Sequence, residues 1–472
     1  MKLKPNHTIF KTKFLEELKF NPTTDQKKAI KKISEFVTNT NAYEIFILKG
    51  FAGTGKTTLI SKLIQTLSYF KIKSVSLAPT GRAAKVLSSY SQEKAHTIHR
   101  KIYFQNTTPE QGIYFSLGRN LHKNTLFLID EASMIASYTS SEHQRDVLND
   151  VIEYVYSGDN CKLIFIGDVG QLPPVGLADS PALSADFLKQ SFSLDIIETE
   201  LTEIVRQEEQ SGILTLATQL RNFSDTIPQL YHNQTDVFTI SGIDLEEELE
   251  SAINNFGQEE VMVITRSNKR ANLFNQQIRH RILWQEDELN AGDVLMVGKN
   301  NYFWIDNSSD IGFIANGEII EVLKVIRREE IYGFEFADVL VRFIDYPQIP
   351  EVELKININA IRHEGANLPR NMMAELFYTI AKEEYPLERN KKIRNKLVMS
   401  NPYFQALQVK FAYAVTCHKA QGGQWDVIFI DQGYFVDDMW SQEYMRWLYT
   451  AVTRAKSKLY LVNFCSPFIE NT

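Results

Sequence analysis

Short apolar runs alternate with longer amphipathic stretches along the first 200 residues. The runs EIFILKG, SVSLAPT, TLFLIDE and KLIFIGD occupy residues 44–50, 74–80, 125–131 and 162–168. Continuous apolar runs of this length are typical of strands buried on both faces of a parallel sheet. Each run ends in small, polar or charged residues, and ligands collect at the carboxyl ends of strands in open α/β sheets. The pattern therefore predicts an α/β lobe with its site at these four strand ends.

The same alternation returns later in the chain. An apolar run, VMVITRS, precedes the amphipathic stretch NKRANLFNQQIRHRI, and near the C-terminus DVIFIDQ and KLYLVNF flank a helical segment. These elements predict a second α/β lobe. Between roughly residues 290 and 405 the pattern changes to strand-like pieces with turn signals, GDVLMVG, ANGEIIEVLKVI and FADVLVRFI, followed by a charged helical stretch. We interpret this region as a small β-barrel insertion that interrupts the second lobe.

Composition narrows the class of protein without identifying it. At 472 residues, with 44% hydrophobic and 23% charged residues, the chain is expected to fold as two or more domains. A net charge of −7 argues mildly against a partner held by bulk positive charge. The basic run Arg389, Lys391, Lys392, Arg394 and Lys396 is either a solvated helix face or part of a local groove.

The cysteines and the longest apolar runs indicate the compartment. Cys161, Cys417 and Cys465 are widely spaced, which favours neither a disulfide framework nor a zinc ribbon and fits a reducing compartment. No apolar run approaches the length needed to cross a bilayer. We therefore expect a cytoplasmic protein with no membrane partner.

A phosphate-binding loop is the clearest local motif. Residues 50–57, GFAGTGKT, match G-x-x-x-x-G-K-S/T between an apolar strand and an amphipathic helix. The glycines let backbone N–H groups point at phosphate oxygens, at the positive end of the following helix. Lys56 is expected to reach the β and γ phosphates of ATP, and Thr57 to ligate Mg²⁺. The full set of expected nucleotide contacts in the loop is Gly53, Thr54, Gly55, Lys56, Thr57 and Thr58.

Other strand ends supply the remaining groups of a hydrolytic site. Asp130 and Glu131 follow TLFLI, where a second magnesium contact and a base that orients the attacking water are needed. We assign the metal contact to Asp130 and the base to Glu131. Gln171 follows the next strand, within reach of the γ phosphate or the water. Arg206 and Arg454 are candidates for cations that stabilise the transferring phosphoryl group, although a single arginine is more often a surface residue.

Taken together, nine ordered segments resemble the helicase motifs of superfamily 1, in the branch with RecD-like and Dda-like enzymes. They are FNPTTDQKKAI, GFAGTGKTT, LAPTGRAAKVL, TIHR, IDEASM, GDVGQLPPVG, LTEIVRQ, YAVTCHKAQGGQWDVIFI and WLYTAVTRAK, and they span about residues 20–464. The string QLPPVG favours this branch over the UvrD-like one. The resemblance implies two RecA-like lobes with ATP between them and movement on a strand from 5′ to 3′.

The resemblance also implies roles for individual residues. Gln26 corresponds to the glutamine that reads adenine, Arg206 to the arginine finger before the second lobe, and Arg454 to the finger within it. Residues expected to face nucleic acid are Pro79, Thr80 and His99 on the first lobe and Thr416, His418 and Lys419 on the second. Their hydroxyl, imidazole and ammonium groups suit phosphate oxygens, which fix register without reading sequence. Taken alone, either histidine is better explained as a partly buried residue bonded to backbone, and the motif context reverses that preference.

A division of the chain follows from the pattern and the resemblance. We expect an N-terminal extension at 1–21, a first RecA-like lobe at 22–200, and a second lobe split into 201–288 and 406–472 around an SH3-like β-barrel insertion at 289–405. A small pin or wedge is expected at 98–123 within the first lobe. There Tyr103, Phe104, Tyr114 and Phe115 either stack on bases or form a local core.

These observations favour an ATP-dependent DNA helicase that works as a monomer on single-stranded and tailed duplex DNA, with Mg²⁺ and ATP. Three alternatives use much the same residues. One is a nucleic-acid-stimulated ATPase that remodels complexes without unwinding, and another is an RNA helicase, since recognition of the 2′-OH is not readable from the sequence. The third, a binding protein with a decayed ATPase, is disfavoured because every residue type of the hydrolytic site is present.

Overall fold

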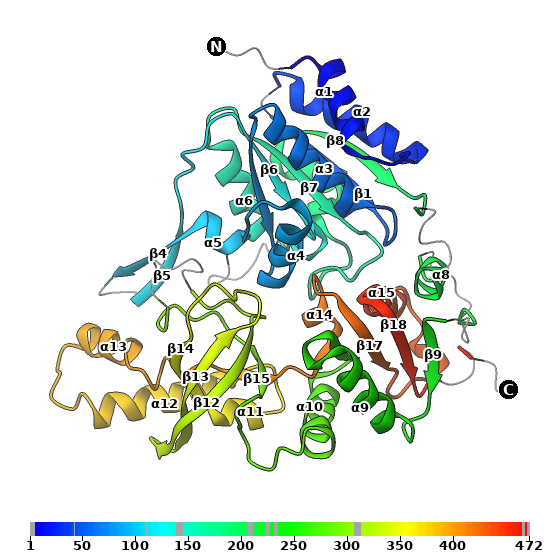
Figure 1. The fold of residues 1–472 in the computed structure, drawn as a ribbon. Helices are drawn as coiled ribbons and strands as arrows, with labels where there is room; N and C mark the ends of the chain where they lie inside the picture. The colour runs from blue at the N-terminus through cyan, green and yellow to red at the C-terminus, as the bar shows by residue number, and fades with distance from the viewer. Residues whose placement is uncertain are drawn as a thin grey trace.

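The apolar run at residues 44–50 forms strand β1, Glu44–Gly50, of a six-stranded parallel sheet (Figure 1). The computed structural model describes residues 5–41, 43–108, 112–137, 145–205, 211–221, 227–230, 235–305, 313–464 and 468–469. The strand order is β3-β2-β6-β7-β1-β8. The other strands are β2 (Lys73–Ala78), β3 (Ala95–Thr97), β6 (Thr125–Ile129), β7 (Lys162–Gly167) and β8 (Asp195–Leu201). We call the part built on this sheet the first lobe.

Alternate side chains of β1 enter two different cores, because successive residues of a strand point to opposite faces. Phe46 and Leu48 pack against α1, α2 and α3, whereas Ile45 and Ile47 pack against α5, α6 and α7. The helices of this lobe are α1 (His7–Glu17), α2 (Thr24–Thr38), α3 (Lys56–Tyr69), α4 (Gly81–Ser91), α5 (Ile98–Ile102), α6 (Val147–Tyr156) and α7 (Ala185–Phe192). Both faces are thus covered, as continuous apolar strands require.

A second parallel sheet, of five strands in the order β16-β10-β17-β18-β9, forms the second lobe. Its strands are β9 (Val237–Ile240), β10 (Val261–Thr265), β16 (Ala414–Thr416), β17 (Trp425–Asp431) and β18 (Ala455–Val462). Its helices are α8 (Gly212–Gln219), α9 (Leu245–Phe256), α10 (Asn268–Gln277), α14 (Cys417–Ala420) and α15 (Gln442–Val452). The predicted α/β architecture with parallel sheets is confirmed. Within the described residues, no helix is both long and apolar enough to span a bilayer.

An antiparallel sheet separates β10 from β16 in the sequence. Its order is β14-β13-β12-β11-β15, formed by β11 (Val294–Val297), β12 (Ile319–Ile331), β13 (Phe334–Phe343), β14 (Val352–Asn357) and β15 (Val409–Phe411). Because β15 pairs with β11, this sheet extends past the expected boundary at residue 405. The apolar run VKFAYAVT continues from β15 into β16 with no turn residue, so composition does not mark the change of sheet.

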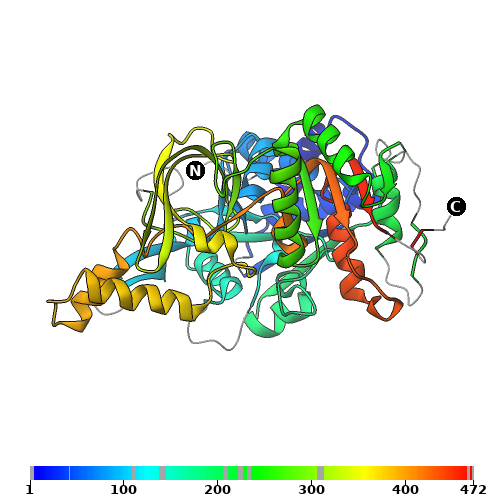
Figure 2. The ribbon, with the colours of Figure 1, turned by 90° about the horizontal axis from the view of Figure 1, so that it is seen from below.

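Two smaller elements project from these sheets. Strands β4 (Tyr103–Thr108) and β5 (Gly112–Leu117) pair as an antiparallel hairpin in the first lobe. Short helix α11 (Ile358–Arg362) leads from β14 to α12 (Arg370–Glu383) and α13 (Lys391–Met399). Figure 2 shows α12 and α13 extending away from the antiparallel sheet, and α13 contacts β5 of the hairpin.

The antiparallel sheet also docks on the first lobe next to α4. Lys85 of α4 binds the Asp345 carboxylate at 3.1 Å, and a side chain on Gly81 would lie 2.9 Å from the Tyr346 hydroxyl and 3.5 Å from Glu318 Cγ. Glu318 is only 3% exposed. Its burial, together with the nearby Asp345 charge, raises the pKa of the Glu318 carboxyl to about 8. Glu318 is therefore largely protonated at neutral pH in the folded protein.

Replacing this carboxyl should change how stability depends on pH. Between the ordinary pKa near 4.5 and the folded pKa near 8, the folded state binds more protons than the unfolded state, so stability falls as pH rises. Glu318→Gln is expected to remove most of this fall and to raise the free energy of unfolding at pH 8 by roughly 1–3 kcal/mol. Thermal unfolding from pH 5 to 8.5 measures this change, with Glu330→Gln, an exposed position on strand β12 that follows Glu318, as control. A wild-type slope that persists in Glu318→Gln would contradict the assignment.

Candidate functional site

The phosphate-binding loop connects β1 to α3 and is shaped by two glycines. Gly53 and Gly55 have φ values of 74° and 79°, in the left-handed region that residues with a side chain rarely adopt. A Cβ on Gly55 would also lie only 2.7 Å from Gln26 Nε2. The Thr54 hydroxyl donates to the Phe51 carbonyl at 2.7 Å, which closes the loop on itself. The first turn of α3 therefore presents Lys56, Thr57 and Thr58 beside the loop.

Lys56 is held by the loop in this structure. Its ammonium donates to the carbonyl oxygens of Gly50, at 2.6 Å, and Phe51, at 2.9 Å, and it lies 3.9 Å from Asp168 Oδ2. Contacts with phosphates would require the ammonium to exchange these carbonyl partners. The Lys56 ammonium therefore lies at the phosphate loop, as the motif predicts, but is bonded to backbone carbonyls of that loop.

The carboxylates follow β6 as expected. Asp130 Oδ1 accepts from the Glu131 N–H at 2.9 Å, and Glu131 has a φ of 51°. A left-handed conformation at a residue with a side chain costs about 1–3 kcal/mol and is concentrated at functional sites. Burial, with the neighbouring Glu131 charge second, raises the pKa of the Asp130 carboxyl to about 6. A cation at this carboxylate would oppose both effects.

Arg454 reaches Glu131, one of these two carboxylates, from the second lobe. It is 3% exposed and is fixed by its own surroundings, since it donates to the carbonyls of Thr450 at 3.1 Å and Gly423 at 3.2 Å. One guanidinium nitrogen lies 3.8 Å from Glu131 Oε1. This ion pair joins the two lobes across a cleft of about 550 Å³. The predicted residues on the cleft wall are Gly53, Gly55, Lys56, Thr57, Thr58, Asp130, Glu131, Gln171 and Arg454.

The groups on this wall fit a triphosphate with magnesium. Hydroxyl and carboxylate oxygens, here from Thr57 and Asp130, are the ligand type that Mg²⁺ prefers. Loop amides and Lys56 suit phosphate oxygens. Gln171 is 6% exposed, and its Oε1 has no hydrogen-bond partner among the described residues. A buried acceptor without a partner is costly, so it points to a ligand at this place.

Gln26 occupies the opposite side of the loop. Its backbone N–H and side-chain Oε1 form a capping box with Thr23 at the start of α2, and its Nε2 donates to the Thr54 carbonyl at 3.0 Å. A second cavity, of about 1040 Å³, adjoins it and is lined by Phe20, Pro22, Val205 and Arg221 among others. Gln26 Nε2 has a second N–H to donate, and Oε1 can accept a second hydrogen bond. Arg206, the other predicted finger, lies outside the described residues.

The residues predicted to face nucleic acid lie at or shortly after the ends of strands in both parallel sheets. Pro79 and Thr80 follow β2, and the Thr80 hydroxyl caps α4 by accepting from Ala83 N–H at 3.2 Å. Thr416 precedes α14, which carries His418 and Lys419. The lobes touch here, since a Cβ on Gly422 would lie 2.8 Å from the Ala83 Cβ. Burial lowers the pKa of both His418 and Lys419.

The structure describes the side chains of His99 and of two of the four predicted pin aromatics. Burial lowers the pKa of His99, and its ring lies 5.4 Å from the Tyr103 ring. The Tyr103 hydroxyl donates to Asp150 at 2.6 Å, which places Tyr103 in a local core, the second of its two expected roles. Phe104 is 59% exposed at the base of the hairpin. The side chains of Tyr114 and Phe115 lie outside the described residues.

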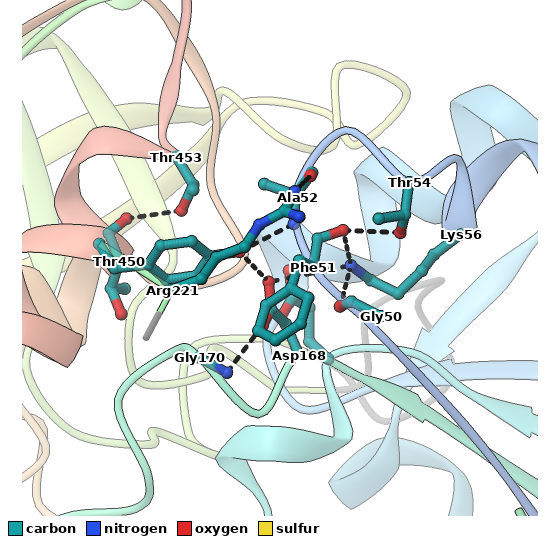
Figure 3. A network of polar contacts seen from close by, with 12 residues as sticks. Gly50, Phe51, Ala52, Thr54, Lys56, Asp168, Gly170, Arg221, Thr450 and Thr453 are labelled. Carbon is teal, nitrogen blue, oxygen red and sulfur yellow. Dashed lines mark hydrogen bonds and ion pairs between the residues drawn. The ribbon is translucent and has the colours of Figure 1, made fainter. Parts of the chain in front are cut away.

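Sequence reasoning missed three residues that the fold brings to the loop, of which Asp168 and Arg221 are labelled in Figure 3. Asp168, at the end of β7, accepts from the Tyr449 hydroxyl of α15 at 2.7 Å. That hydroxyl also accepts from Ala52 N–H, at 2.8 Å. Arg221, which follows α8, donates to the Ala52 carbonyl at 3.1 Å. Asp168 and Tyr449 stood within the quoted motifs GDVGQLPPVG and WLYTAVTRAK without a role assigned to them, and nothing in the sequence distinguished Arg221 from a surface residue.

Comparisons with known proteins agree with this geometry. An AAA domain matches residues 22–239 and a UvrD-like helicase C-terminal domain matches residues 411–462. The ATP-dependent DNA helicase dda of Enterobacteria phage T4 is 26% identical over 63% of this chain and 64% of its own length. The RecBCD enzyme subunit RecD of Buchnera aphidicola subsp. Schizaphis graminum is 23% identical over 95% of this chain and 75% of its own.

A solved structure shares the fold. The crystal structure of Pif1 helicase from Bacteroides in complex with ADP-AlF3 and ssDNA superposes with a TM-score of 0.50. The match covers 96% of this chain and 95% of the other at 17% sequence identity. The likeness therefore extends over both lobes and the antiparallel sheet inserted between β10 and β16 of the second lobe.

Proposed function

This chain belongs to the superfamily 1 helicases, in the branch that contains RecD, Dda and Pif1, and on that premise we propose that it is an ATP-dependent DNA helicase that moves 5′ to 3′. The observation that carries the proposal is the cleft between the lobes. It gathers the phosphate loop, two carboxylates and Gln171 from one lobe, and Arg454 from the other. A site divided in this way couples the state of the nucleotide to the distance between the lobes.

Each residue of the cleft has a proposed role in hydrolysis. Lys56 binds the β and γ phosphates, Gln26 reads the adenine base, and Glu131 orients the attacking water. Thr57 and Asp130 would hold Mg²⁺, which supplies charge neutralisation at the phosphate oxygens. Gln171 directs its unpartnered amide oxygen at the water or the γ phosphate, and Arg454 stabilises charge on the transferring group, with Arg206 as a second finger.

Closure and reopening of this cleft would drive movement on the strand. With nucleotide bound, Lys56 and Arg454 contact it from opposite lobes and hold them together. After hydrolysis the shared charge is lost and the lobes separate. Thr80 and His99 move with the first lobe, and Thr416, His418 and Lys419 move with the second, so strand contacts tighten alternately. Pro79, beside Thr80, completes the proposed strand-facing set.

The antiparallel sheet and the hairpin complete the proposal. We assign the sheet, at residues 289–405 with β15 added, to an SH3-like insertion in the second lobe, and the β4–β5 hairpin to a strand-separating pin. The exposed ring of Phe104 lies at the base of that hairpin and is suited to stack on a base.

The first experiment compares steady-state ATP hydrolysis with and without a single-stranded DNA oligonucleotide and follows strand displacement on a tailed duplex. The helicase proposal expects strong stimulation, strand displacement, and a requirement for a 5′ tail. Stimulation without displacement would favour a remodelling ATPase. Greater stimulation by a matched RNA would favour an RNA helicase.

A further inference from the structure

The backbone of Ala52, in the phosphate loop, is bonded at both its N–H and its carbonyl by residues of the second lobe. Its N–H donates to the Tyr449 hydroxyl at 2.8 Å and its carbonyl accepts from Arg221 at 3.1 Å. The Arg221 guanidinium also lies 4.8 Å from the centre of the Phe51 ring, the preceding residue of the loop. The first half of the loop is therefore attached to the lobe that does not contain it, as Figure 3 shows.

The Tyr449 hydroxyl also connects the second lobe to the cation of the site. It donates to Asp168 Oδ2 at 2.7 Å, and the other Asp168 oxygen accepts from Gly170 N–H at 2.8 Å. The same Oδ2 lies 3.9 Å from the Lys56 ammonium. One fully buried hydroxyl thus reaches both the loop backbone and the carboxylate that faces Lys56.

Helix α15 carries this hydroxyl together with other contacts to the first lobe. The Thr450 hydroxyl, next along the helix, accepts from Leu172 N–H at 2.8 Å, beside Gln171. Arg454 follows the same helix and pairs with Glu131. A displacement of α15 therefore acts on the loop, on the Gln171 segment and on the proposed base at once.

Helix α15 is also packed against α14, which carries the proposed strand contacts. The two helices touch, and the Cys417 thiol of α14 contacts the Trp447 carbonyl of α15 at 3.4 Å. A buried side chain linked in this way moves with its helix, because interiors are close-packed and transmit displacement. The path from His418 and Lys419 to the phosphate loop thus runs through α14, α15 and the Tyr449 hydroxyl.

We propose that Tyr449 is the positioning residue that couples strand binding on the second lobe to the phosphate loop and Lys56. This role rests on the proposed function, since it needs hydrolysis that responds to DNA. In this structure the hydroxyl bonds Ala52 and Asp168 while Lys56 donates to the loop carbonyls. When strand binding shifts α14 and α15, the hydroxyl shifts Asp168 and the loop, and Lys56 is released toward the phosphates.

The test removes the hydroxyl and keeps the ring. Tyr449→Phe is expected to lower the ratio of ATP turnover with single-stranded DNA to turnover without it by roughly 5- to 150-fold, the usual range of coupling between sites. The KM for ATP should change by less than about threefold, because the proposed ATP contacts are made by other residues and uniform binding is retained.

A second tyrosine provides a closely matched control. Tyr413 is buried, donates to Asp293 at 3.1 Å and accepts from Val294 N–H at 3.1 Å, but it lies beside the antiparallel sheet. Tyr413→Phe removes the same kinds of hydrogen bond away from the cleft and should leave the ratio at the wild-type value. Thermal unfolding of both variants compares their stability.

The outcomes separate this inference from the proposed function. A wild-type ratio in Tyr449→Phe, or equal losses with and without DNA, would overturn the coupling role while leaving the helicase proposal intact. An equal fall of the ratio in Tyr413→Phe would also overturn it, because the effect would then be general destabilisation. Wild-type turnover that ignores DNA would refute the proposed function and this role with it.

Discussion

Glu131→Gln is expected to bind ATP with nearly wild-type affinity and to lose roughly 10²- to 10⁴-fold in turnover, the usual contribution of a general base. Glu131 stands at the end of β6 with a φ of 51°, on the wall of the cleft that contains Lys56. The amide keeps the size of the side chain and one acceptor oxygen, but it cannot accept the proton of the attacking water. The change removes an interaction needed in the transition state, so kcat should fall and affinity should not.

Nucleotide affinity and single-turnover hydrolysis, measured on the same preparation, test this expectation. Glu35→Gln, on the exposed face of α2 in the same lobe, is the matched control and should behave as wild type. Normal hydrolysis by Glu131→Gln would remove Glu131 as the base. Loss of ATP binding would instead show that the carboxylate contributes to binding.

Arg454→Ala is expected to lower the turnover number by about 10³- to 10⁵-fold, as loss of an arginine finger does. Arg454 comes from the second lobe, and its guanidinium lies 3.8 Å from Glu131 at the place where the lobes meet. Transferring a phosphoryl group spreads charge over its oxygens, and a buried guanidinium stabilises that charge strongly in a site with little water. Affinity for ATP should change little, since Lys56 and the loop remain.

Two further variants make this expectation specific to the position. Arg454→Lys keeps the positive charge but loses the planar fork that bonds Thr450 and Gly423, so it should recover only part of the lost rate. Arg446→Ala removes an arginine within α15 that also crosses to the first lobe, where it contacts Asp179. Wild-type turnover in Arg454→Ala, or an equal loss in Arg446→Ala, would count against the finger.

The parts of the site that the sequence predicts are those whose residues are neighbours in the chain. Glycines, a lysine and a threonine within eight residues specify the phosphate loop, because a tight turn before a helix is a local structure. One apolar run ends in Asp130 and Glu131, and Gln171 closely follows the next, which places those side chains at one edge of a parallel sheet. The alternation of runs also specified the α/β architecture, since strand and helix periods are local properties.

Contacts across the cleft were decided by the tertiary structure alone. Ala52 and Tyr449 are 397 positions apart in the sequence, and neither belongs to a residue type that marks a site. Arg454 could be selected among the arginines only through the family resemblance. Its ion pair with Glu131 is seen only in the folded structure. The extension of the antiparallel sheet through β15 could not be predicted, because one apolar run continues from β15 into β16 and composition does not mark the change of sheet.

Residue order alone predicts a nucleotide site and two α/β lobes, because apolar periodicity and the side chains that follow each strand can be recognised in neighbouring residues. How the second lobe contacts that site depends on the folded structure. A hydroxyl, a guanidinium and a helix end acquire a role there because packing brings them to the loop, and packing depends on contacts that no local pattern records.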